Sequence, residues 1–414
     1  MNIVFVMHYA GSPIYGMAYR PHYLAREWVR QGHQVTMVAA SFSHLRLKQP
    51  EIRNDLQSEN IDGINYLWIK TPEYHSTPKR VVNICVFVEK LKNYAKKIAE
   101  DYKPDLVIAS SCYPFDIYPC KKIAKYAGAK LCFEVHDLWP LTPMLVGGYS
   151  KWNPYIMLMQ RAENVAYSSA DFVNSLLWNS EKHAQEHGLK PDRFQCVPNG
   201  YSKEEWQEIN ANNIPEEHLQ FFKKLREENK LIIGYAGSYA PAQFLETLLS
   251  AAKSLQSNPK VHIIFVGKGP KYGDYMEIVQ RDHLKNVTIL PAVNKRLVPN
   301  IVDNFDVCYM GGGHSLLHQY GTSYNKEIDY MLAGKPIVKS IDEPGSLVER
   351  IDCGILTEAE NPEQVAKAIN TLAAMSDEER REMGMRGKKY AEENLEWGTL
   401  AKKFLAPMDS LKKQ

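Results

Sequence analysis

Residues 320–338 read YGTSYNKEIDYMLAGKPIV, and this stretch decides the fold because it predicts a loop, a short helix and a buried strand in succession. Small and polar residues come first and can cap a helix that starts near Lys326. Gly334 is the expected C-cap residue, and Pro336 follows just beyond the helix. This order of elements is typical of an α/β protein.

The start of this helix has the chemistry of an anion site. A first helical turn offers unpaired N–H donors and a partial positive charge, and Lys326 adds a full charge. Asp329 lies one turn further on, where its carboxylate can accept hydrogen bonds from two hydroxyl groups. Asn325, Lys326 and Asp329 are therefore candidate contacts to the phosphates and ribose of a nucleotide. An ordinary capped helix would show the same residues, so both interpretations stay open at this point.

The length and composition of the chain limit the possible classes of protein. A chain of 414 residues predicts two domains, and 44% hydrophobic with 24% charged residues is typical of a soluble globular protein. A net charge of +2 without a dense basic block argues against nucleic acid as a partner. Seven scattered cysteines without a C-x-x-C pair predict a reducing cytoplasm, and neither a signal peptide nor a membrane span is expected.

Alternating strand and helix patterns predict parallel sheets that are covered by helices. Residues 2–8 form an apolar run, a glycine-containing loop with Gly11 and a helical pattern follow, and residues 34–40 form the next apolar run. The loop is not G-x-G-x-x-G, and no acidic residue ends the second strand, which disfavours a dinucleotide dehydrogenase. A second series begins at residue 231, after a polar and charged stretch over residues 201–230 that we predict to be the inter-domain connection. We expect two tandem α/β domains with a ligand in the cleft between them.

The predicted domain boundaries follow from these patterns. The first domain spans residues 1–205, the second spans residues 206–390, and residues 391–414 form a helix that packs back on the first domain. Residues 79–103 form a helix with seven Lys or Arg against three Asp or Glu. This helix either covers the first sheet with a solvated basic face or lies on an anionic membrane surface.

Two strand ends of the second domain carry polar or small residues that suit a ligand site. Gly237 and Ser238 end the strand that starts at residue 231, and Gly267 and Lys268 follow the strand over residues 261–266. Small residues allow a backbone to approach a phosphate, although an ordinary turn would look the same.

In the first domain, the strand that ends in EVHDLWP places His136 and Asp137 at its carboxyl end. Either side chain is a candidate to contact a sugar hydroxyl or a reacting acceptor, and a structural histidine is the alternative. No other His or Cys has ligand spacing to this pair, so no metal is expected there. Covalent hydrolase chemistry has little support, because no nucleophile elbow is visible.

The order of the motifs resembles family 4 of the glycosyltransferases, and in particular bacterial enzymes of O-antigen and capsular polysaccharide assembly. The resemblance covers nearly the whole chain and rests on HYLAREWVRQGHQVTMV (22–38), EVHDLWP (134–140), VPNG (197–200), IGYAGSYAPAQFLETLLSAA (233–252), FVGKGP (265–270) and NKEIDYMLAGKPIV (325–338). It implies the α/β GT-B fold, in which two Rossmann-like domains face a central cleft and a C-terminal helix crosses back to the first domain.

The resemblance also implies where the donor binds. The family has two acidic residues eight positions apart, of which the second matches Asp329 and the first matches Gly321. Many relatives hold the diphosphate with an Arg and a Lys, whose positions are Ser238 and Gln243 in this chain. The cationic role is therefore expected of Lys326.

Other residues have subsidiary roles in this scheme. Lys268 is a weaker candidate for the cationic role. Gly11, in the first loop, is a candidate binding residue, and Arg20, in the helix after that loop, is a further candidate contact to phosphate or acceptor. His136 matches a histidine that faces the donor sugar, and Asp137 is a minority candidate for a base. The resemblance implies transfer with retention and without an obligatory metal, in which the donor phosphate takes the acceptor proton.

The sequence thus predicts a cytoplasmic, nucleotide-sugar-dependent hexosyltransferase. The donor is expected to be a UDP sugar, and the acceptor a lipid-linked saccharide at the inner membrane face, with residues 79–103 as the contact to an anionic membrane. Two alternatives stay open. One is a GT-B sugar-nucleotide epimerase or hydrolase, and the other is a non-catalytic GT-B partner of a transferase, because the first acidic residue and the basic pair of the family are absent.

Overall fold

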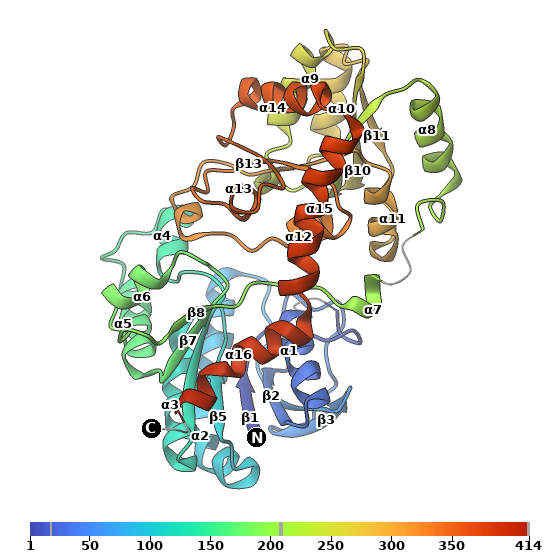
Figure 1. The fold of residues 1–414 in the computed structure, drawn as a ribbon. Helices are drawn as coiled ribbons and strands as arrows, with labels where there is room; N and C mark the ends of the chain where they lie inside the picture. The colour runs from blue at the N-terminus through green and yellow to red at the C-terminus, as the bar shows by residue number, and fades with distance from the viewer. Residues whose placement is uncertain (17–18, 207–209, 412–414) are drawn as a thin grey trace. The chain divides into compact units, whose positions relative to one another are not determined.

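The chain divides into two compact units, which Figure 1 shows as ribbons. The computed structural model describes residues 1–16, 19–206 and 210–411. The first unit comprises Met1–Asn199 and Trp397–Gln414, and the second unit comprises Gly200–Glu396. The predicted ranges 206–390 and 391–414 include residues 207–209 and 412–414, which lie outside the described residues.

The first unit is built on a sheet with the strand order β3-β4-β2-β1-β5-β6-β7-β8. Every pairing is parallel except that of the edge strand β3 with β4. Its strands are β1 (Asn2–Val6), β2 (Gln34–Ala40), β3 (Gln57–Ile61), β4 (Ile64–Ile69), β5 (Leu106–Ala109), β6 (Lys130–Val135), β7 (Phe172–Ser175) and β8 (Phe194–Cys196). The central strands are buried over almost their whole length, as expected for a parallel sheet with helices on its faces.

The C-terminal helix belongs to this first unit. The helices are α1 (Tyr19–Arg30), α2 (Thr77–Tyr102), α3 (Ile117–Ala127), α4 (Leu141–Gly147), α5 (Pro154–Ser169), α6 (Glu181–Glu186) and α16 (Trp397–Leu411). Figure 1 shows α16 beside α1, and the indole of Trp28 in α1 donates a hydrogen bond of 3.0 Å to the Ala401 carbonyl. The Trp397 ring stacks on Tyr23 with 5.6 Å between centroids, so the last helix completes the core.

The second unit repeats the architecture with the strand order β11-β10-β9-β12-β13-β14, all parallel. Its strands are β9 (Leu231–Ser238), β10 (Val261–Lys268), β11 (Val287–Leu290), β12 (Val307–Gly311), β13 (Ile337–Ser340) and β14 (Gly354–Thr357). Its helices are α7 (Lys203–Trp206), α8 (Glu216–Glu227), α9 (Glu246–Leu255), α10 (Tyr272–Arg281), α11 (Val298–Asp303), α12 (Asn325–Leu332), α13 (Leu347–Arg350), α14 (Pro362–Ala374) and α15 (Asp377–Asn394). The predicted α/β class with two parallel sheets is confirmed.

The polar stretch over residues 201–230 differs from its prediction as an inter-domain connection. Residues 216–227 form α8, which buries Phe222 and Leu225 in a core cluster of the second unit. The helix is amphipathic, and its many charged residues hid the apolar face from the sequence analysis. The edge strands β3 and β14 were also not predicted, because neither has the apolar run of a central strand.

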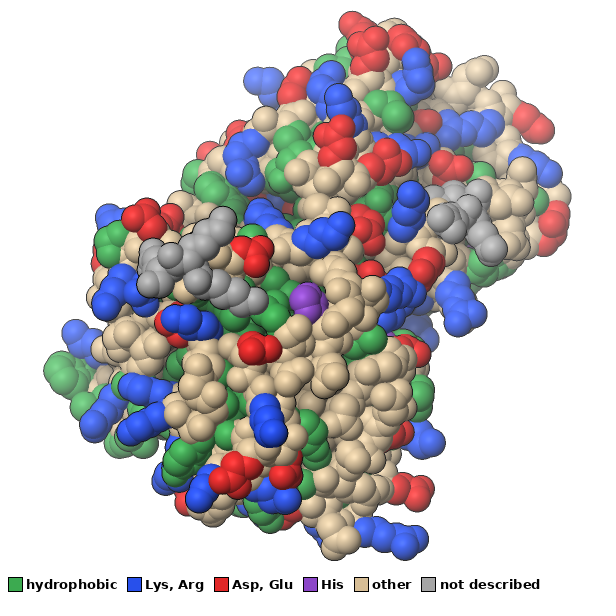
Figure 2. Space-filling view, turned by 60° about the horizontal axis from the view of Figure 1, so that its bottom comes forward, with side chains coloured by type: hydrophobic (Ala, Val, Ile, Leu, Met, Phe, Trp, Pro, Cys, Tyr) green, Lys and Arg blue, Asp and Glu red, His purple; other side chains and the backbone are tan. Residues whose placement is uncertain are grey.

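The basic helix over residues 79–103 packs in the first unit as α2. Its apolar face, which includes Phe87 and Leu91, is buried. Three of its lysines lie beside carboxylates on the same helix, and Lys90 lies 3.0 Å from Asp55. Figure 2 likewise shows acidic and basic side chains interspersed over the visible face. Among the described residues, no helix combines the length and the apolar character that a membrane span requires.

Candidate functional site

The carboxyl ends of β9 and β10 lie side by side in the second unit. The parallel register pairs Gly237 with Gly267 and Ser238 with Lys268, so four predicted site residues share one edge of the sheet. Gly267 is required by this close approach, because a Cβ at its position would lie only 1.9 Å from the Gly237 carbonyl oxygen. The exposed Ser238 and Lys268 side chains follow directly.

Lys326 reaches this edge from the first turn of α12. A Cβ on Gly237 would lie 3.1 Å from the Lys326 Nζ, so the absence of a side chain at position 237 leaves room for the ammonium group. The Nζ donates hydrogen bonds of 2.7 Å to the Tyr235 hydroxyl and to the Gln243 Oε1, and it lies 3.9 Å from the centroid of the Tyr235 ring. The structure thus brings Lys326 together with the predicted Gly237.

The partners of Lys326 are neutral, which sets its protonation. Burial lowers the pKa of Lys326 to about 7, and the nearby charge of Asp329 opposes this shift only in part. The ammonium form is therefore easily lost in the free protein and would be stabilised by an incoming anion. Gln243 stands at the position that the family pattern gives to a cation. Its amide oxygen instead orients the ammonium group of Lys326.

The N-cap residue of α12 is Tyr324, whose side chain makes no capping hydrogen bond, so the predicted small or polar residue at the N-cap position is wrong. Thr322 instead donates its hydroxyl and its backbone N–H to Glu343, at 2.8 and 2.7 Å. Asn325 is exposed at the first turn. The first turn therefore keeps the partial positive charge that favours an anion.

Asp329 lies one turn along α12, half-buried. Its carboxylate makes no hydrogen bond to another described residue. Burial raises its pKa to about 6, while the charges of Lys295 and Lys326 oppose the shift. A half-buried carboxylate without a bonded partner is suited to accept hydrogen bonds from a ligand's hydroxyl groups.

Beneath the first turn of α12, a second lysine has opposite surroundings. Lys339 is fully buried in β13, and its Nζ lies 2.9 Å from the Glu327 Oε1 and 2.5 Å from the Glu343 Oε2. Burial lowers the pKa of Lys339, but the two carboxylates outweigh it and raise the pKa overall. Since Glu343 also binds Thr322, this buried network fixes the loop before α12.

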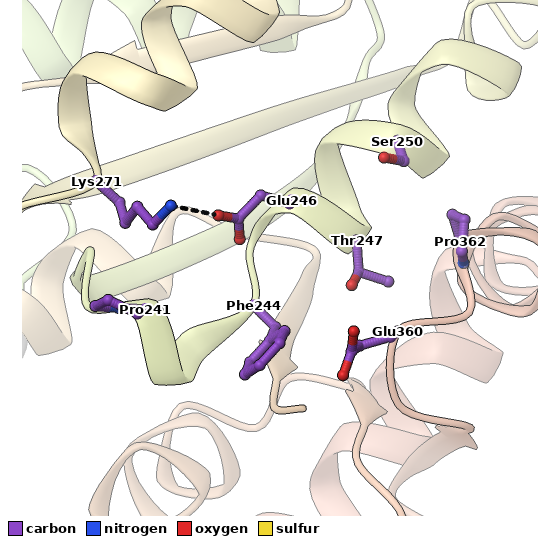
Figure 3. A pocket seen from close by; sticks show the side chains of 8 residues that line it. All are labelled: Pro241, Phe244, Glu246, Thr247, Ser250, Lys271, Glu360 and Pro362. Carbon is purple, nitrogen blue, oxygen red and sulfur yellow. Dashed lines mark ion pairs between the residues drawn. The ribbon is translucent and has the colours of Figure 1, made fainter. Parts of the chain in front are cut away.

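A pocket of about 380 Å³ lies in the same unit, beside the turn from β9 to α9, and Figure 3 shows the residues that line it. Glu246 and Glu360 give it acidic character, and the Lys271 Nζ lies 3.5 Å from the Glu246 carboxylate. None of the predicted site residues lines this pocket. Two carboxylates would repel a diphosphate, so we place the candidate anion site at Lys326 instead.

In the first unit, His136 is the outermost member of a buried polar chain at the end of β6. The Arg20 Nε donates 3.0 Å to the Glu134 Oε1, the Ser110 hydroxyl donates 2.5 Å to the Glu134 Oε2, and the His136 Nε2 lies 2.9 Å from the Ser110 Oγ. Burial opposes ionisation of Glu134, but Arg20 and His136 lower its pKa to about 2.

This chain assigns the tautomer of His136. Because the Ser110 hydroxyl hydrogen is directed to Glu134, the His136 Nε2 must carry a proton to bond Ser110 or Glu134, which lies 3.2 Å away. In the neutral imidazole the Nδ1 is then the acceptor, and it can receive a hydrogen bond from a sugar hydroxyl.

Three predicted residues of the first unit have structural partners. The Arg20 guanidinium is buried and also donates to the carbonyls of Val197 and Pro198, at 2.8 and 2.6 Å, so it positions Glu134 and is not an open phosphate contact. Both Asp137 oxygens accept hydrogen bonds from its own loop, including 2.6 Å from Thr142, which argues against a base. Gly11 is buried, and its carbonyl accepts 2.9 Å from Tyr66.

Four residues of these networks were not predicted to take part in a site, namely Ser110, Glu134, Tyr235 and Lys339. A signal was present for two of them, because Glu134 and Lys339 stand within otherwise apolar strands. A charged residue in a buried strand implies a buried partner of opposite charge. No comparable signal marks Tyr235, which reads as an ordinary core aromatic residue.

Two models of known protein families match the sequence of this chain. Residues 15–200 match the model described as "Glycosyl transferase 4-like domain", and residues 230–375 match the model described as "Glycosyl transferases group 1". Together they cover well over half of the 414 residues. The chain therefore belongs to the family 4 type of glycosyltransferase with the GT-B fold, which confirms the resemblance at the level of the family. A search of curated proteins by sequence finds no match.

Solved structures with the same fold cover essentially the whole chain. Sucrose-phosphate synthase from Thermosynechococcus elongatus has a TM-score of 0.70 and 15% identity, with 100% of both chains covered. Anabaena Alr3699/HepE in complex with UDP and glucose has a TM-score of 0.63 and 16% identity over 100% of both chains. WaaG, a glycosyltransferase involved in lipopolysaccharide biosynthesis, has a TM-score of 0.62 and 13% identity, with 97% of this chain and 98% of WaaG covered.

Proposed function

We propose that this glycosyltransferase transfers a hexosyl group, with retention, from a UDP sugar to a lipid-linked or oligosaccharide acceptor in surface polysaccharide synthesis. The observation that carries the proposal is the placement of Lys326 against Gly237, at a helix N-terminus and one turn from Asp329. A diphosphate and a ribose are the ligand groups that this arrangement suits. The UDP and glucose bound to HepE support the choice of donor.

The mechanism follows from where charge develops. As the bond to the sugar breaks, negative charge grows on the leaving diphosphate, and Lys326 with the first turn of α12 would stabilise it electrostatically. His136 would accept a hydrogen bond from a sugar hydroxyl through its Nδ1. The donor phosphate would take the acceptor proton, because the Asp137 oxygens already bind the loop.

The nucleotide site is tested by separating the ligand into its parts. Binding of UDP, uridine and pyrophosphate is measured calorimetrically for the wild type, Lys326→Met and Asp329→Asn. Lys326→Met should weaken UDP and pyrophosphate about 10- to 100-fold, the value of a charge-assisted hydrogen bond, and leave uridine unchanged. Asp329→Asn should weaken UDP and uridine and leave pyrophosphate unchanged. Lys268→Met, which removes an exposed lysine at the same edge, is the matched control and should have a smaller effect.

Catalysis is tested with a panel of sugar nucleotides. Slow hydrolysis of one donor without acceptor, and retention of configuration in the transferred product, would support the transferase. If no sugar nucleotide binds or is consumed, the chain is a non-catalytic partner protein. If the donor is isomerised or only hydrolysed, the epimerase or hydrolase alternative replaces the transferase. If both site variants bind UDP as the wild type does, the assigned site is wrong.

A lipid-linked acceptor implies peripheral contact with the inner, cytoplasmic membrane face, and α2 offers a weak surface for it because carboxylates accompany its lysines. The surface of α4, α5 and their connection has more suitable chemistry. It exposes large apolar side chains, with Lys151 placed 5.2 Å from the Trp152 ring, and its apolar members are Leu145, Val146, Tyr149, Trp152, Met157 and Leu158. Aromatic and aliphatic side chains beside a lysine are typical of membrane-interface residues.

Flotation with vesicles that contain anionic lipid compares the two surfaces. The triple variant of Val146, Trp152 and Leu158 to Ser should lose most of its vesicle binding, whereas the variant of Lys92, Lys96 and Lys97 to Gln should lose little. Loss of flotation only in the lysine variant would return the contact to α2. A wild-type protein that does not float would refute the membrane contact while leaving the nucleotide site untouched.

A further inference from the structure

Two helices of the first unit, α5 and α6, bring together three side chains with metal-binding groups. His183 lies on α6 and His187 follows its end, four residues later, so both rings lie on the same side of the helix. Glu163 faces them from α5. One ligand atom from each of the three residues lies within 4.8 Å of the other two. Glu163 and His183 are buried and His187 is half-buried, so an ion could enter from the His187 side.

The Gln160 side chain holds this cluster from outside. Its Nε2 lies 2.7 Å from the Glu163 Oε2, 2.9 Å from the Asn164 Oδ1 and 3.0 Å from the His187 Nδ1, and its two hydrogens can be donated to Glu163 and Asn164.

The tautomer of His187 follows from a contact to Asn164. The His187 Nδ1 lies 2.9 Å from the Asn164 Oδ1, to which it donates when it carries the ring proton. In that neutral tautomer the His187 Nε2 has the lone pair with which an imidazole binds a metal ion.

Outer contacts orient the three side chains. The His183 Nε2 lies 2.8 Å from the Glu163 Oε1, and the second Glu163 oxygen is held by Gln160, as outer hydrogen bonds hold metal-binding carboxylates. The Tyr167 ring stacks on His187 with 6.5 Å between centroids and fixes its orientation.

We propose that Glu163, His183 and His187 form a zinc site that clips α5 to α6. Two imidazoles and a carboxylate match the ligands that Zn²⁺ prefers, with water in the fourth position. The ion would stabilise the first unit and take no part in sugar transfer. Both zinc affinity and thermal stability should therefore respond to this site without any change in nucleotide binding.

The test uses the full chain after dialysis against a chelator. Zn²⁺ is titrated in competition with a chromophoric chelator, and Co²⁺ is added as a spectroscopic probe. We expect one ion per chain, a visible tetrahedral Co²⁺ spectrum that Zn²⁺ abolishes, and a higher melting temperature with Zn²⁺.

Three variants locate the ion. His187→Gln, at a half-buried position that should still fold, must lose stoichiometric binding and the spectrum, whereas His283→Gln, at an exposed histidine of the second unit, must retain both. Gln160→Ala should weaken binding about 10- to 100-fold, as loss of an outer partner does. Binding that is absent in the wild type, or unchanged in His187→Gln, would overturn the proposal.

Discussion

Lys326 and Lys339 lie on neighbouring elements of the second unit, yet their surroundings differ in one decisive respect. Lys339 is enclosed with two carboxylates, and its pKa is raised because they outweigh the cost of burial. Lys326 is held by a phenol hydroxyl, an amide oxygen and an aromatic ring, and burial lowers its pKa to about 7. Lys339 therefore forms ion pairs within the protein, whereas the hydrogen-bond partners of Lys326 stay neutral until an anion binds.

The difference separates a structural charge from a binding charge. A buried ion pair is costly to break, because removal of one partner leaves the other charge without compensation. When a cation surrounded by neutral groups is replaced, the protein loses little stability, but the interaction of that cation with a ligand is lost. Thr322, Glu327 and Glu343 fix the loop before α12, and that loop presents Lys326.

The largest effect is expected from removal of the structural lysine. Lys339→Met should lower the free energy of unfolding by about 3 to 5 kcal/mol, because Glu327 and Glu343 are then buried together without a cation. Lys326→Met should change it by less than about 1 kcal/mol, since the methionine still packs on the Tyr235 ring. Urea unfolding of both variants at neutral pH measures this. Equal losses of stability would remove the distinction between the two lysines.

The next effect concerns pH. The anion binds the protonated form of Lys326, so above pH 7 binding requires uptake of a proton and the affinity for UDP should fall by up to about tenfold per pH unit. The terminal phosphate of UDP, whose second pKa is about 6, only gains negative charge as the pH rises, so it does not cause the decrease. Calorimetry between pH 7 and 9 checks the slope, together with buffers of different ionisation enthalpy that reveal the proton uptake.

Two variants serve as controls for this slope. Lys326→Met should bind weakly with no pH dependence, and Lys326→Arg should retain its affinity at pH 9, because arginine stays protonated. A wild-type affinity that is constant from pH 7 to 9 would show that Lys326 is already charged in the free protein, and the contrast with Lys339 would then be one of geometry alone.

The sequence predicted the fold well because the responsible signals are local. The apolar run over residues 34–40 located β2 to the residue, and the helix near Lys326 was found from its flanking glycine and proline. The amphipathic α8 was missed because its few apolar residues stand among many charges. The order of the motifs predicted the family, and the two family models confirm that prediction.

The details of the site could not be predicted because they depend on contacts across the fold. Tyr235 lies 91 residues from Lys326, and nothing local indicates that its hydroxyl would meet the ammonium group. Arg20 was expected to contact a ligand, but its partner Glu134, 114 residues away, occupies it. The proposed zinc site had a local signal in the four-residue spacing of His183 and His187. This spacing was not predicted to bind a metal, because only the surroundings of His136 were considered for metal ligands.

The smallest expected effect extends the comparison to a carboxylate. Burial moves the pKa of Asp329 toward neutrality, to about 6, as it does for Lys326. Unlike Lys326, the Asp329 carboxylate forms no hydrogen bond with a described residue. Its raised pKa means that the protonated form is favoured by folding: stability is gained as the pH falls from 6 toward 4 and lost as it rises again through 6. Ribose hydroxyls need the ionised form as acceptor, so binding and folding should respond in opposite directions.

Uridine affinity should fall about tenfold between pH 7 and 5 in the wild type and stay constant in Asp329→Asn, while Asn325→Ala, one turn away, should keep the wild-type profile. Uridine titrations at these pH values measure this directly, and a profile in Asp329→Asn that matches the wild type would show that the ribose is bound elsewhere.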